Sequence, residues 1–228
     1  MRRIFNLLIW FCILVFTIPG LAQEKQQGSG YQEAAEKLET LSKKAESVSS
    51  VRYKSARTLK MYQPGLSPQT ITATSTHWIK GKYSRVESVS SDSAFAGITI
   101  GRPDGFYKEE SGQYIKLLNE PPSGVRDEWT KSLKHVTSRV LGTEIIDSKE
   151  STVFEFSSDS GSVLKEWIWN KNGLPLKIES SSVSDSQISQ SFTEEYSEFV
   201  FEDIPDSMFE VPRDKILDMT DFFKNQQE

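Results

Sequence analysis

The spacing of apolar residues divides the chain into one helical segment and a long series of strands. Between Tyr31 and Ser50, apolar side chains recur every three or four positions, which places them on one face of a helix. From Val51 onward the period changes to two, as in half-buried strands, and it returns in short runs as far as Phe201. This pattern predicts a helix whose apolar stripe covers a sheet.

Polar segments containing Gly, Pro or Ser separate the predicted strands. Asn172-Gly173 is the strongest of these hairpin signals, because both residues accept the positive φ of a type I′ turn. A short helix is predicted at 126–136, and a last amphipathic piece contains Ile216 and Leu217. The strands are predicted at 51–61, 70–79, 83–90, 96–100, 106–108, 113–118, 139–148, 151–157, 163–169, 174–179 and 188–201.

Sequential strands at this spacing predict an antiparallel meander. We therefore expect a mainly β (α+β) fold, a curved antiparallel sheet or incomplete β-barrel. The N-terminal helix and short later helices would cover its inner face, and its outer face would be polar. A front helix followed by a sheet explains both periodicities.

The first 22 residues have the three parts of a secretory signal peptide. Arg2 and Arg3 precede the apolar run 4–18, and Gly20 and Ala22 are small residues at the positions that a signal peptidase reads. The alternative is a transmembrane anchor, for which this run is short, since a spanning helix needs about 20 residues. We expect cleavage after Ala22 and export to the periplasm.

The expected organisation is a signal peptide at 1–22, a flexible lead-in at 23–30 and a single domain at 31–228. Cys12 is the only cysteine and lies inside the apolar run, so the mature chain would carry neither a disulfide nor a lipid-modified cysteine. Cleavage changes the formal net charge from −5 to −7. Basic residues form no stripe interleaved with aromatics, which makes nucleic-acid binding improbable.

Catalytic and metal-binding motifs are missing from the sequence. His77 and His135 are the only histidines and stand far apart without a second ligand at helical or hairpin spacing, so we expect no metal. No nucleophile elbow, phosphate-binding loop or dinucleotide fingerprint occurs, and we expect no cofactor. A two-carboxylate glycosidase remains open as the last-ranked hypothesis, because acids crowd the C-terminal strand at Glu194, Glu195, Glu198, Glu202, Asp203 and Asp206.

Tryptophans are the more informative side chains. Trp78, Trp129, Trp167 and Trp169 lie in the predicted domain, and Trp167 and Trp169 share one face of a strand. They favour either an aromatic sheet core or the lining of an apolar cavity that holds the tail of a ligand.

Four segments resemble one known family. They are an early hairpin, an apolar strand leading into Asp-Gly-aromatic, a late hairpin and a C-terminal signature, at 78–83, 98–107, 167–178 and 201–212. With the signal peptide and the striped helix, they resemble the LolA-like outer-membrane lipoprotein-sorting superfamily, which also holds periplasmic stress-sensing regulators. The resemblance covers nearly the whole mature chain.

The resemblance implies a strongly curved, incomplete antiparallel barrel closed by helices, with an apolar cavity for the acyl chains of a lipoprotein or lipid. Such proteins are carriers and not enzymes. One departure concerns the arginine that latches the helical lid in the dedicated carriers. Gly81 stands in its place here, and Ala45 stands where the first helix has a bulky apolar residue.

Our first hypothesis is an exported, non-enzymatic binding protein for an apolar or acylated ligand. The expected partners are lipoprotein acyl chains or a lipid, and the inner strand face and covering helix would bind them. The candidate residues are Leu38, Leu41, Val48, Trp78, Trp167 and Trp169. The alternative is an envelope regulatory or interaction module that uses the same fold to bind a protein partner.

Overall fold

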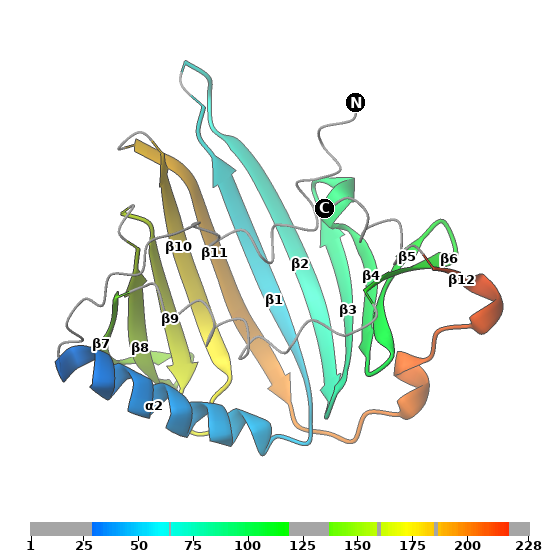
Figure 1. The fold of residues 1–228 in the computed structure, drawn as a ribbon, viewed down its shortest axis with the longest axis horizontal. Coiled ribbons are helices and arrows are strands. Elements are labelled where there is room, and N and C mark those ends of the chain that lie inside the picture. Colours follow the sequence, from blue (N-terminus) through cyan, green and yellow to red (C-terminus); the bar gives the residue numbers. More distant parts are fainter. Residues whose placement is uncertain (1–28, 64, 119–136, 159–160, 185–186, 219–228) are drawn as a thin grey trace.

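The computed structural model describes residues 29–63, 65–118, 137–158, 161–184 and 187–218. Within these ranges the chain forms one helix and one open, twelve-stranded sheet (Figure 1). The helical elements are α2 (Ser29–Glu46) and the short 3₁₀ turns η1 (Ser93–Phe95), η3 (Asp206–Phe209) and η4 (Arg213–Lys215). No helix in these ranges combines the length and the apolarity that crossing a bilayer requires.

The strands follow closely the predicted boundaries. They are β1 (Ser50–Met61), β2 (Gln69–Lys80), β3 (Tyr83–Ser90), β4 (Gly97–Arg102), β5 (Gly105–Glu110), β6 (Gln113–Leu118), β7 (Thr137–Ile146), β8 (Lys149–Ser157), β9 (Val163–Trp169), β10 (Pro175–Ser184), β11 (Gln187–Val200) and β12 (Ile216–Asp218). The prediction of a curved, mainly β fold with an unclosed sheet is confirmed. The helix predicted at 126–136 and the boundary at Ala22 lie outside the described residues.

The sheet consists of two meanders joined at one seam. Its order is β12-β6-β5-β4-β3-β2-β1-β11-β10-β9-β8-β7, so β1–β6 and β7–β11 each run in sequence, and β1 meets β11 in the centre. The seam is antiparallel, with Arg52 opposite Val200 and Met61 opposite Gln190. The last amphipathic piece is a strand, β12, which pairs in parallel with β6. Neither pairing follows from a simple meander.

The Asn172-Gly173 hairpin is confirmed, but its predicted turn type is wrong. Five residues separate β9 from β10, and Gly173 has φ +73°, whereas Asn172 is not among the residues with positive φ. The Asn172 side chain instead accepts a hydrogen bond from the Leu174 amide at 3.2 Å. The turn lies directly against α2, where Lys44 Nζ donates to the Asn170 carbonyl at 2.6 Å.

Both faces of the sheet carry buried apolar clusters. We call the face that packs against α2 the helix-side face and the opposite one the outer face. On the helix-side face, α2 covers Phe154, Phe156 and Ile168. On the outer face, the segment 204–211 covers Ile100 and Tyr107. The expectation of a polar outer face is therefore wrong at this end of the sheet, because the C-terminal segment buries apolar side chains there.

Candidate functional site

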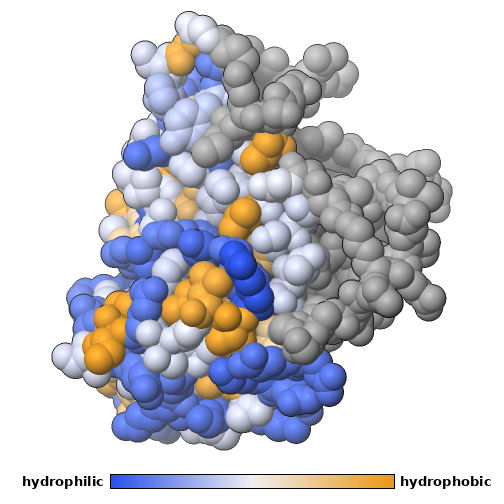
Figure 2. All heavy atoms as spheres, turned by 90° about the vertical axis from the view of Figure 1, so that its left-hand side faces the viewer, coloured by the Kyte–Doolittle hydropathy of each residue, from blue (hydrophilic) through white to orange (hydrophobic). Residues whose placement is uncertain are grey.

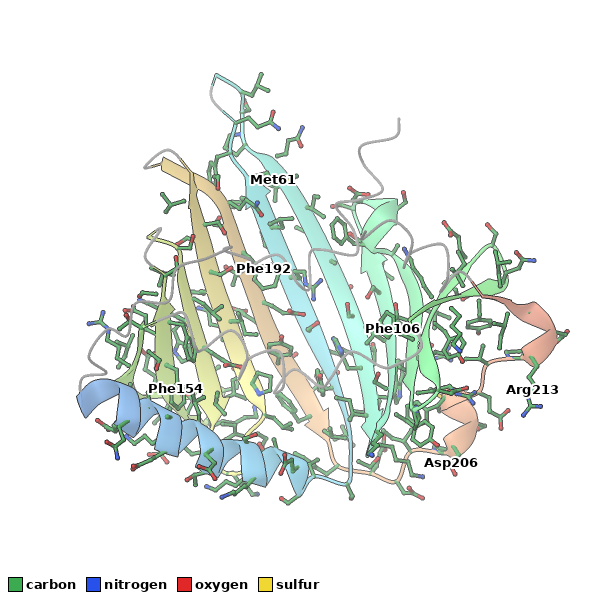
Figure 3. The ribbon with its side chains drawn as sticks, in the orientation of Figure 1. Met61, Phe106, Phe154, Phe192, Asp206 and Arg213 are labelled. Carbon is green, nitrogen blue, oxygen red and sulfur yellow. The ribbon has the colours of Figure 1, made fainter. Side chains whose placement is uncertain are left out.

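One cross-strand row connects the regions of the helix-side face. It runs from Phe154 on β8 through Glu166, Ile178 and Glu194 to Arg57 on β1. Neighbouring strands lie about 4.8 Å apart, so this row spans roughly 19 Å between its end strands. Figure 3 shows Phe154 beside α2 and Phe192 farther along the sheet. The face has an apolar seam, a polar middle and an apolar hollow.

The apolar seam lies between α2 and strands β8 and β9. Ala34 and Leu41 are buried against Phe154, Phe156 and Ile168. Ala34 and Leu41 are two helical turns apart, and residues at this interval share a face of the helix. Leu38 packs against the same cluster. The seam is filled by α2, so an apolar ligand enters it only by replacing the helix.

An ion pair between a half-buried arginine and a buried glutamate occupies the polar middle. Arg57 Nη2 lies 3.1 Å from both carboxylate oxygens of Glu194, which is only 4% exposed. Both oxygens of this carboxylate thus take part in charge-assisted hydrogen bonds, which offset the water lost on burial. Tyr196 lies close to this pair, and burial, followed by the Glu194 charge, raises the pKa of its phenol well above the usual value of 10.0.

Next to the ion pair, Ser55 Oγ and His77 Nε2 lie 2.9 Å apart, and the Tyr53 ring stacks on the imidazole at 4.6 Å. Burial lowers the pKa of His77 to about 4, against the opposite effect of Glu194, so the ring is neutral at pH 7. Within the described residues no carboxylate is hydrogen-bonded to His77, and so weak a base suits general-base catalysis poorly. In the described residues the Ser55–His77 pair thus lacks the orienting carboxylate of a catalytic triad.

An apolar hollow lies beyond the ion pair, on the central strands. It is lined by Arg57, Leu59, Ile71, Ala73, Phe95 and Phe192. The Arg57 guanidinium carbon is 5.4 Å from the centroid of the Phe192 ring. The hollow is about 10 Å³, which is close to the room needed for one water. An acyl chain therefore needs the walls of the hollow to move apart.

A larger hollow opens on the outer face. It measures about 380 Å³, and apolar and acidic residues line it together, among them Trp167, Leu176, Glu144 and Glu195. Trp167 Nε1 donates to a Glu144 oxygen at 2.8 Å. Lys177 Nζ lies 5.1 Å from the centroid of the Trp167 ring, a cation–π contact. This mixed lining differs from the apolar one expected for an acyl-binding site.

The structure divides the six predicted binding residues between the two faces. Leu38, Leu41 and Val48 lie on the helix side, at the seam and at the start of β1. Trp78 packs against the cluster under segment 204–211, and Trp167 and Trp169 share another outer-face cluster. The expected inner-face position of these tryptophans is wrong. A period of two shows that residues share a face of a strand but does not show which element covers that face.

The C-terminal acids serve as ion-pair partners of the first strands. Glu194, Glu198 and Glu202 contact three basic residues of β1, and Asp203 and Asp206 both lie within 3.0 Å of Lys80 Nζ. Within the described ranges no three His, Cys, Asp or Glu side chains are grouped so as to hold a metal ion. Most of these acids, which the sequence left open as glycosidase residues, thus line the β1–β11 seam and the turn beside it.

Comparison with known proteins gives a likeness of fold. The sequence matches no protein-family model and no curated protein. Among solved structures, an uncharacterized conserved protein from Thermus thermophilus is similar over 82% of this chain and 98% of its own, with a TM-score of 0.50 and 11% identity. A LolA superfamily protein from Nitrosomonas europaea is similar over 76% of this chain and 97% of its own, with a TM-score of 0.38 and 14% identity. The fold resembles that of LolA-like proteins.

A third similar structure is MucB in the MucA/MucB complex of Pseudomonas aeruginosa, with a TM-score of 0.47 and 10% identity. This chain is similar to it over 79% of its own length and 61% of that chain. The curved, unclosed antiparallel sheet that the sequence motifs predicted is the fold that the described residues form. At such identities the likeness concerns the fold alone.

Sequence reasoning missed the polar centre of the helix-side face. Arg57, Glu194 and Glu166 all fall in the apolar phase of strands with a period of two, and this is the signal that could have found them. Glu166 stands two residues from both Leu164 and Ile168, so it shares their buried face. A charged residue in that phase predicts either a buried ion pair or a functional group.

Proposed function

We propose that this protein is an exported, non-enzymatic binding protein for an apolar or acylated ligand in the periplasm. One observation carries the proposal: the apolar part of the helix-side face extends beyond the reach of α2. The helix covers Phe154 and Phe156, whereas Leu59 and Phe192 line the separate hollow on the central strands. An apolar chain laid along this face would bury its carbons at about 0.8 kcal/mol per methylene.

The ligand would exchange with α2 for the same surface. Leu38, Leu41 and Val48 are then the residues that the ligand displaces, and the strand residues beneath them are the ones that it contacts. Gly81, which stands in the place of the latch arginine, lies in an exposed turn whose amide donates to the Ser49 carbonyl just after α2. A Cβ added at Gly81 would meet nothing within 4 Å. A glycine has no side chain with which to latch the helix, and we do not propose lipoprotein shuttling.

Ligand length provides the test. Saturated alcohols of eight and twelve carbons, titrated below their micelle concentrations, should differ in Kd by as much as about 200-fold, which corresponds to four methylenes buried for about 3 kcal/mol. Displacement of a fluorescent fatty acyl probe measures both affinities. Native mass spectrometry of protein from its own host should also show a bound lipid. Equal affinity for the two alcohols, or no uptake of the probe, would contradict the proposal.

A matched pair of variants locates the site. Phe192→Asp places a charge in the hollow and should weaken probe binding at least about tenfold. An acyl chain that covered the new carboxylate would deprive it of water. Val89→Asp is the control, because Val89 is 75% exposed and on the outer face. Urea unfolding of both variants shows that they are folded. Equal probe binding by the two variants would place the ligand elsewhere.

The alternative function, a module that binds a protein partner, is favoured by the open edge of the sheet. Strand β7 ends the strand order, and its Leu141 and Ile145 are 43% and 76% exposed. Figure 2, which turns this side toward the viewer, shows apolar atoms among polar ones. An edge strand can pair with an extended segment of another protein. Recovery of a stoichiometric protein partner with no lipid bound would favour this function.

A further inference from the structure

Glu166 is a carboxyl group in apolar surroundings on the helix-side face. Across the sheet it lies between Phe154 and Ile178, and along β9 it lies between Leu164 and Ile168. Three of these four neighbours belong to or pack against the cluster that α2 covers. Glu166 is only 4% exposed, and its Oε2 atom is buried without a hydrogen-bond partner among the described residues.

The other buried glutamates of the described ranges have cations. Glu155 lies 2.6 Å from Arg139, and Glu194 lies 3.1 Å from Arg57. Glu166 has no such contact in the described part of the chain, and burial raises the pKa of its carboxyl well above 4.5. A buried carboxyl without a partner destabilises the folded protein, because it loses its water and gains nothing in exchange. Its presence is explained if the missing partner arrives with a ligand.

We propose that Glu166 binds a primary ammonium group at the polar end of the apolar ligand, while the tail lies on the apolar side chains around it. The inference rests on the proposed function and names its ligand class: a cationic amphiphile with a single apolar chain. An ammonium donates hydrogen bonds to the free carboxylate oxygens, and the water-poor surroundings strengthen this charge pair. An anionic head is disfavoured, because it would find no free cation here: Arg57, the basic residue of this row, is already paired with Glu194.

Three probes of equal length separate head from tail. Dodecylamine, dodecanol and dodecanoate are titrated against the purified protein at pH 7, below their micelle concentrations. Dodecylamine should bind at least about tenfold more tightly than dodecanol, and dodecanoate should bind more weakly than both. Glu166→Met should remove the advantage of the amine and leave dodecanol binding within about twofold. Glu166→Gln should keep only part of the advantage, because it retains hydrogen-bond acceptance without charge.

The outcomes distinguish this inference from the proposed function. Equal binding of all three probes, or an unchanged preference for the amine in Glu166→Met, overturns the role of Glu166 and leaves the apolar site standing. Failure of all three probes to bind overturns both. Glu166→Met replaces an unpartnered carboxyl with an apolar side chain of similar length, so its melting temperature at pH 7 should rise. A fall in melting temperature would show that Glu166 is paired in the free protein and would also overturn the inference.

Discussion

Replacing Gly173 with alanine is expected to lift α2 from the sheet and to lower the free energy of unfolding by about 3–5 kcal/mol. Gly173 has φ +73°, and a Cβ added there would overlap the Leu41 carbonyl oxygen and lie 2.9 Å from the Ala45 amide nitrogen. Both are backbone atoms of α2 and cannot rotate aside. The helix must move, and Leu41 then loses its contacts with Phe154. Urea unfolding measures the loss, and hydrogen exchange in α2 shows where it arises.

Gly81→Ala is the matched control for this substitution. Gly81 also has positive φ, at +55°, but its turn leaves open space around the added methyl group. The substitution at Gly81 should cost only the backbone strain, about 1 kcal/mol.

The Gly173→Ala variant should also take up apolar probes faster than the wild type, if the ligand and α2 compete for one surface. Equal stability losses at the two glycines would contradict the close contact between this turn and the helix.

Acidification from pH 7.5 to 4.5 should cost the protein about 2.5 kcal/mol through His77 alone. The pKa of this imidazole falls from an ordinary value of 6.5 to about 4 in the folded state, chiefly through burial. Between these two values the unfolded chain binds a proton that the folded chain does not. Stability therefore rises with pH across this window, and it is lost as the pH falls from about 6.5 toward 4.

His77→Gln isolates this contribution, since glutamine is neutral at every pH and can still hydrogen-bond to Ser55. The difference in unfolding free energy between wild type and variant should be constant above pH 7.5 and shrink by about 2.5 kcal/mol by pH 4.5. The two unfolding free energies must be subtracted because Glu166 titrates in both proteins. Its raised pKa stabilises the folded state as the pH falls, which is opposite to the effect of His77. A constant difference over the whole range would show that the pKa of His77 is the same in the folded and unfolded states.

The strands and the helix could be predicted because local chemistry decides them. Alternation such as Val51-Arg52-Tyr53-Lys54 favours a strand at any position in the sheet. The stripe through Leu38 and Leu41 likewise requires an apolar surface opposite it, whatever that surface is. The turn after Lys80 could be predicted because Gly81 accepts the positive φ, here +55°, that a tight turn between two strands requires.

The features that the sequence did not predict depend on contacts between segments far apart in the chain. Nothing near Arg57 in the sequence indicates that its carboxylate partner is Glu194, because the pair exists only through the β1–β11 seam. The assignment of Trp78 and Trp167 to the inner face failed because the sheet is covered on both sides. The prediction of a type I′ turn at Asn172 was wrong because five residues, and not two, separate the paired strands there. The three candidate residues of the helix segment therefore lie on the expected face of the sheet, and the three tryptophans lie on the other; that any of the six binds a ligand stays a prediction.

The central seam also determines the order in which the protein can fold. Strand β1 is the first strand of the described chain to be synthesised, yet its partner β11 is the last long strand. Until then one edge of β1 exposes unpaired backbone groups, and such long-range pairings form slowly. Lys54 and Lys60 are exposed on this strand, and charges of this kind deter intermolecular pairing. Most of the chain must therefore be available before the sheet is continuous, and β1 is the strand most vulnerable to aggregation in that interval.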